Sequence, residues 1–121
     1  MKWIGQITYD ETSYFREDIL IEDGNKLKLG TGDDLSIYHD GSNSFIDNIT
    51  GNLKLRNYAD NKDIEFWCDD GSGGIVKYFY LDGGLGYTKA SKDIYLVDDV
   101  RLRAGTGGDF SFFHDGSNSK I

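Results

Sequence analysis

The sequence contains no proline, and only one of its 121 residues is a cysteine. With a single thiol, Cys68, no disulfide can form within the chain, which excludes a disulfide-stapled scaffold. Cys68 stands in the stretch EFWCDD, which we expect to be a strand, and we predict a buried, inert thiol there. The missing proline, set against 16 glycines, predicts many tight turns with positive φ and no stiff linkers.

Basic residues and long apolar runs are also scarce. The chain has 13 lysines and arginines against 21 aspartates and glutamates, and its formal net charge is −8. Neither nucleic acid nor an anionic membrane is therefore an expected partner. No apolar run approaches the ~18 residues of a membrane-spanning helix. The first residues, MKWIGQITYDE, lack the apolar core of a signal peptide, so secretion is not expected.

What the sequence does contain is a repeat. The string HDGSNS occurs at 39–44 and again at 114–119. It lies within two longer segments, 27–46 and 102–121, which align without gaps at an offset of 75 residues and share 13 of 20 residues. A weaker match extends upstream, so 18–46 and 93–121 are interpreted as two copies of one module. We predict an N-terminal segment at 1–17, a first repeat period at 18–92 and a truncated second repeat at 93–121, and hence a piece of a longer array.

Short runs of alternating apolar and polar residues predict strands. The predicted strands are 19–22, 26–29, 35–39, 44–48, 52–57, 63–68, 75–81, 93–97, 100–104 and 110–114. Between them, Asn-Gly, Asp-Gly and Gly-Gly pairs supply the positive φ angles of tight turns. Only DETSYFRED, at 10–18, could form a short helix. The predicted fold class is all-β, repeat-built and with short strands; an intertwined homotrimeric β-fibre or β-helix is favoured, and a single-chain β-solenoid or sandwich is the alternative.

The repeated hexapeptide invites a catalytic interpretation, but strand alternation favours a turn. His39 follows Leu35 and Ile37 on one face of a predicted strand, and Asp40 and Gly41 then begin the turn. His114, Asp115 and Gly116 repeat this arrangement. We expect each imidazole to bond the turn backbone or the following carboxylate. A metal site would need several symmetry-related copies, because one histidine per copy cannot fill a tetrahedral shell. No metal, cofactor or catalytic residue is predicted.

Two other features were weighed for chemistry. The acidic, glycine-rich DDGSGG at 69–74 has neither the ligand spacing of a calcium loop nor the lysine of a phosphate-binding loop, so a hairpin turn is expected. Trp67, Tyr78 and Tyr80 are candidate glycan contacts, since aromatic rings stack on sugars; packing in a core or a subunit interface is the favoured role. A glycan hydrolase would need two convergent carboxylates, and the sequence singles out no pair.

The strings LGTGDDLSIYHDGSNSFI, GNLKLRNYADNKDIEFWCDDGSGG and YFYLDG together resemble the repeats of marine bacteriophage tail-fibre-type structural proteins. The resemblance covers roughly 18–121. The second copy departs from the first at Lys120, which corresponds to Phe45. The resemblance implies a structural segment of a phage tail fibre or related virion fibre that is assembled in the host cytoplasm and contacts the host surface.

From that resemblance we expect no enzymatic activity, self-association as a homotrimer, and a host-surface glycan or protein as the further partner. The alternative is a monomeric carbohydrate-binding β-sandwich that uses the aromatic residues above as its platform. A virion location follows from the first function only.

Overall fold

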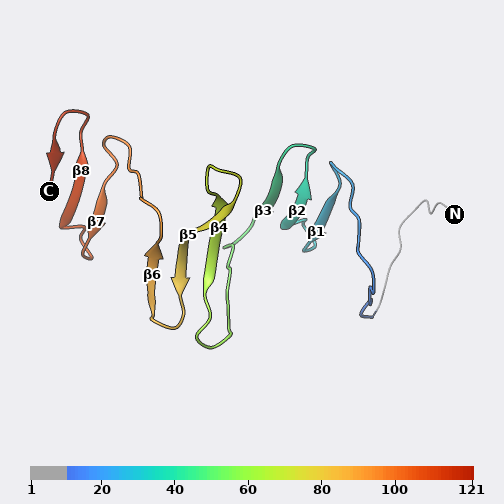
Figure 1. Ribbon diagram of the computed structural model, residues 1–121. Helices are drawn as coiled ribbons and strands as arrows, with labels where there is room; N and C mark the ends of the chain where they lie inside the picture. Colours follow the sequence, from blue (N-terminus) through green and yellow to red (C-terminus); the bar gives the residue numbers. More distant parts are fainter. Residues whose placement is uncertain (1–10) are drawn as a thin grey trace. The chain divides into compact units, whose positions relative to one another are not determined.

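The computed structural model describes residues 11–121 and contains only β-structure over that range. Nine strands form three separate three-stranded antiparallel sheets, and none of them closes into a barrel. Each sheet is a simple meander in which every strand pairs with the next one along the chain (Figure 1). The all-β prediction is therefore confirmed. The helix considered for DETSYFRED is wrong for residues 11–18, which form bends and irregular structure, while residue 10 lies outside the described range.

The first sheet contains β1 (Lys26–Leu29), β2 (Leu35–His39) and β3 (Ser44–Asn48), as the alternation predicted. Its register aligns Leu27, Ile37 and Ile46 across the three strands. Because side chains alternate along a strand, this alignment gathers the aliphatic residues on one face. The opposite face carries Lys26, Lys28, Tyr38, Phe45 and Asp47.

The second sheet contains β4 (Ile64–Asp69), β5 (Ile75–Asp82) and β6 (Tyr87–Ala90). A register shift between Phe66 and Trp67 leaves Tyr78 of β5 without a partner on β4. Such a bulge leaves one residue unpaired and disrupts the ladder only locally, so that pairing resumes on either side of it. Val76 and Phe79, on opposite sides of the bulge, therefore both pair with apolar residues of β4.

The third sheet contains β7 (Leu102–Ala104), β8 (Phe110–His114) and the two-residue β9 (Ser119–Lys120). Leu102 pairs with Phe112 and Ala104 with Phe110. These are the counterparts, 75 residues on, of the Leu27–Ile37 and Leu29–Leu35 pairs of the first sheet. The two sequence copies thus use the same register.

Several strand predictions were wrong. Segments 19–22, 52–57 and 93–97 alternate in sequence but form no ladder, whereas β6 and β9 were not predicted. Alternation is necessary for a half-buried strand, but a ladder also needs a partner at the right register. β6 finds one because a tight turn at Gly83–Gly86 returns the chain along β5.

No apolar side chain is buried anywhere in residues 11–121, and Ser36, 7% exposed, is the only residue that counts as buried. The chain divides into two units, Met1–Lys54 and Leu55–Ile121; the first holds β1–β3 and the second holds β4–β9. The buried thiol predicted for Cys68 is wrong, because the side chain is exposed. Cys68 pairs with Val76 on the apolar face of the second sheet, and no other strand of the same unit packs on that face.

Candidate functional site

The turn after β2 is held by its own side chains. The backbone N–H of Gly41 donates to His39 Nδ1 at 3.0 Å, and the N–H groups of Ser42 and Asn43 donate to Asp40 Oδ1 at 2.8 Å. These two bonds lower the pKa of Asp40 below its ordinary value, with the bond from Asn43 the larger cause. Gly41 has φ 99°, a left-handed conformation that disfavours any side chain.

The same turn recurs after β8. Gly116 N–H donates to His114 Nδ1 at 3.1 Å, and the N–H groups of Ser117 and Asn118 donate to Asp115 Oδ1. Lys120 adds an ion pair that the first copy lacks. Together these contacts, with that of Lys120 the largest, lower the pKa of Asp115 to about 2. Both hexapeptides are therefore organised as turns, to which Ser42 and Ser117 contribute backbone donors.

Each histidine also lies beside a carboxylate from the preceding turn. His39 Nδ1 is 3.2 Å from Asp23 Oδ1, and His114 Nδ1 is 3.0 Å from Asp98 Oδ1. The carboxylate that we expected from the sequence was the one that follows the histidine. Alignment of the two copies was the signal that could have found Asp23 and Asp98, because both stand sixteen residues before their histidine.

The second sheet brings Trp67 and Tyr80 to one face together with two lysines. Lys77 Nζ lies 4.2 Å from the centroid of the Tyr80 ring and 5.7 Å from that of Trp67. Glu65 accepts from Trp67 Nε1 at 2.8 Å and pairs with Lys77, and these contacts, with Lys77 the larger cause, lower the pKa of Glu65. The third candidate, Tyr78, is the bulged residue, and its hydroxyl donates to the Asp69 carbonyl at 2.9 Å.

The remaining residues of this face continue the same pattern. Lys89 Nζ is 3.0 Å from Asp82 Oδ2 and lies 5.2 Å from the centroid of the Tyr87 ring. The bond to Asp82 is the main cause that raises the pKa of Lys89 to about 12. Each cation of this face is thus neutralised by a carboxylate next to an aromatic ring, which suits contact with a neutral polar ligand better than contact with an ion.

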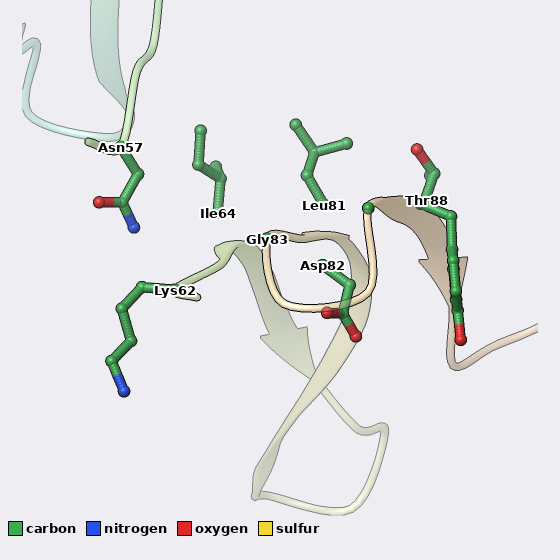
Figure 2. A pocket seen from close by; sticks show the side chains of 9 residues that line it. Asn57, Lys62, Ile64, Leu81, Asp82, Gly83 and Thr88 are labelled. Atoms are coloured by element: carbon green, nitrogen blue, oxygen red, sulfur yellow. The ribbon is translucent and has the colours of Figure 1, made fainter. Parts of the chain in front are cut away.

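Two shallow depressions border this sheet. One is lined by Asn61, Lys62, Asp63, Glu65 and Trp67. The other lies at the end of the sheet near the Gly83–Gly86 turn, and Figure 2 shows Ile64 and Leu81 projecting to one side of it and Asp82 to the other. The second depression therefore joins the apolar face to a polar rim.

The largest unexplained features are the apolar faces themselves. The first sheet presents Leu27, Leu29, Leu35, Ile37 and Ile46; the second presents Ile64, Phe66, Cys68, Val76, Phe79, Leu81 and Ala90; the third presents Leu102, Ala104, Phe110 and Phe112. Many of these side chains are more than two-fifths exposed, among them Phe66, Leu81 and Phe112. Exposed apolar area of this kind is uncommon on a monomeric soluble protein.

Within residues 11–121, no three histidine, cysteine or carboxylate side chains converge to hold a metal ion. The same residues form no helix of the length and apolarity needed to cross a membrane. In comparisons with known protein families, curated proteins and solved structures, nothing matches this chain.

Proposed function

We propose that the chain is a structural segment of a phage tail fibre or a related virion fibre, assembled in the host cytoplasm and carried on the virion. In this role copies of the chain associate, as a homotrimer, through the apolar faces of their sheets, and the assembled fibre contacts the host surface. The observation that supports the proposal most is that no apolar side chain in residues 11–121 is buried within the single chain.

An uncovered apolar face is unfavourable in water, by about 25 cal/mol for each Å² that could be buried. Three strands are the minimum for a sheet to be stable by itself in water, and the third strand of the last sheet, β9, has only two residues. Each sheet here also has two edge strands with unpaired backbone groups, which invite pairing with another chain. A second and third copy of the chain would cover the faces and pair the edges in one step.

The repeated module supports the same assembly. The β1–β2 and β7–β8 hairpins share their register, and each is followed by a turn with the same bonds. Identical modules along a chain can stack on the corresponding modules of neighbouring chains. The proposal assigns no catalytic residue, and the repeated His-Asp-Gly serves to fix the turn.

The experiment is a measurement of mass in solution by light scattering coupled to size exclusion. The expected result is three times the chain mass of 13.6 kDa, unchanged over a tenfold dilution. A folded, stable monomer with the strand content described above would overturn the proposal, because its faces would then be hidden by the chain itself.

A carbohydrate-binding role is the second candidate, and the exposed Trp67 supports it. Its side chain is 52% exposed, and it borders the depression that contains Asn61 and Asp63. An indole face beside amide and carboxylate groups suits stacking and hydrogen bonding with a neutral sugar. A neutral-glycan array that binds wild type but not Trp67→Ala would support this candidate, and a blank array would exclude it.

A further inference from the structure

The third sheet differs from the first in the charged residues of one face, while its other face stays apolar. The apolar faces keep their character, since Leu35 and Ile37 become Phe110 and Phe112. On the opposite face, Lys26 and Lys28 become Arg101 and Arg103, and Phe45 becomes Lys120. On this face the second copy therefore has one more cation than the first, and two of its three cations are guanidinium groups. This is unexpected on a chain whose net charge is −8.

The same face of the second copy also loses an acid. In the first copy, Lys28 Nζ pairs with Asp33 Oδ2 at 2.7 Å. The residue that corresponds to Asp33 is Gly108, and a Cβ built there would meet Cδ of Arg103 at 3.4 Å. An aspartate at position 108 would therefore lie beside Arg103, as Asp33 lies beside Lys28. Because residue 108 is glycine, Arg103 has no such carboxylate next to it.

The cations and the aromatic ring of this face lie together. Arg101 Cζ stands 3.7 Å from the centroid of the Phe113 ring, and Lys120 Nζ lies 5.8 Å from it. Of the three cations, only Lys120 forms an ion pair among the described residues, with Asp115. Arg101 and Arg103 are two residues apart, so along an extended chain they repeat at about 7 Å. We call Arg101, Arg103, Phe113 and Lys120 the basic face.

We propose that the basic face binds an acidic polysaccharide, with the two guanidinium groups on its anionic substituents. Planar guanidinium groups pair with carboxylate, sulfate and phosphate oxygens through two parallel hydrogen bonds, which lysine cannot do. Cations repeated along a flat, exposed face suit an extended polymer with repeated anions better than a small molecule that needs an enclosed cavity. This inference rests on the proposed function, since contact with a cell surface supplies the polymer.

Nucleic acid fits this face less well. Duplex DNA carries one negative charge per about 1.7 Å, and the many carboxylates elsewhere on the chain repel so dense a charge. A polysaccharide with one acidic group per sugar carries a sparser charge, and short-range pairing at the basic face is then sufficient against screened repulsion. Discrimination between the two polymers is therefore part of the expected behaviour.

The test uses the whole chain and an oligogalacturonate as the probe, followed by amide NMR and titration calorimetry at low salt. The decisive variant is Gly108→Asp, which restores the acid of the first copy. It is expected to fold, because Asp33 already adopts φ 56° at the corresponding position, where Gly108 has φ 68°. The matched control is Asp33→Gly, which removes the acid from the first copy instead.

The expected result is that wild type binds the probe, that Gly108→Asp weakens binding at least about threefold, and that Arg101→Ser with Arg103→Ser abolishes it. Asp33→Gly is expected to leave the affinity of the third sheet unchanged. Amide shifts should concentrate around 101–120, and added salt should weaken binding.

The inference is wrong if wild type does not bind the probe, if Gly108→Asp and wild type bind it equally, or if a duplex oligonucleotide binds as well as the oligogalacturonate. Light scattering of the same samples separates this inference from the proposed function. If the protein is a trimer but does not bind the probe, only the proposed ligand is wrong. If the protein is a monomer, the proposed fibre assembly is wrong. If Arg101→Ser with Arg103→Ser lowers the mass, the basic face is a contact between copies, and the inference is likewise wrong.

Discussion

The Asp98 carboxylate lies 3.0 Å from Nδ1 of His114, although sixteen residues separate the two in the chain. The same nitrogen stands 3.1 Å from the backbone nitrogen of Gly116. One ring nitrogen accepts a hydrogen bond when it is unprotonated and donates one when it is protonated. It therefore bonds either Gly116 or Asp98 at any moment, and the first copy has the same pair of alternatives at His39.

We predict that each imidazole supplies the hydrogen-bond acceptor for the glycine amide of its own turn. In His114→Ala, the Gly116 N–H loses Nδ1 as its acceptor, so its amide proton should move upfield and exchange faster with solvent. The measurement is an amide NMR spectrum of both proteins at the same pH. Gly41, whose acceptor is His39 Nδ1, is the internal control and should not change, and an unchanged Gly116 amide would contradict the bond.

Lys120 is predicted to set the pKa of Asp115. The pKa of this carboxyl is about 2 against an ordinary value of 3.8, and the contact with Lys120 is the largest cause. In Lys120→Phe, which restores the first-copy residue, the pKa of Asp115 should rise toward 3.8, as measured from its carboxyl carbon shift. Asp40 in the same sample is the control and should not change.

The depressed pKa of Asp115 also fixes the direction of a pH effect on stability. The group's contribution to the free energy of unfolding is fully present above its unfolded value of 3.8 and is lost as the pH falls through about 2. Acid unfolding of the second-copy turn should therefore begin at higher pH in Lys120→Phe than in wild type. Identical acid transitions would show that the ion pair contributes nothing in solution.

Charge on an apolar face should break the assembly, while charge on the opposite face should not. Phe112, 43% exposed, pairs with Leu102 on the apolar face, and Ser111, next to it on β8, pairs with Arg103 on the basic face. Phe112→Asp should reduce the mass in solution to that of one chain, because a buried unpaired carboxylate costs several kcal/mol. Ser111→Asp is the matched control and should keep the wild-type mass. Equal behaviour of the two variants would mean that this face is not the interface.

The bulge in the second sheet predicts an unusual tolerance to deletion. Removal of Tyr78 would leave Val76 and Phe79 on one face and Lys77 and Tyr80 on the other, as a regular strand requires. We expect the deletion to retain the circular dichroism of the sheet and to shift the melting temperature by less than about 4 °C. Deletion of Tyr80 is the control; it moves Leu81 to the opposite face and should destabilise the sheet much more.

Local structure could be predicted well where it is set by neighbours in the chain. The strands at 26–29, 35–39, 44–48 and 110–114 form with the predicted bounds, because alternation and the flanking Gly and Asp turn residues act over a few residues. The same logic placed His39 at the end of a strand. It failed for 52–57 and 93–97, whose alternation is as clear but which have no ladder partner.

The sequence by itself determined the all-β character, the repeated hairpin and the Asp-Gly turns, since each depends on side-chain periodicity and on φ angles at single glycines. Only the tertiary structure decided which carboxylates meet the histidines, that the extra residue of β5 is Tyr78, and that Cys68 is exposed. These depend on strand register and on what covers a face, and contacts between residues far apart in the chain settle both. A periodic pattern specifies that an apolar face exists, but it does not specify what buries it.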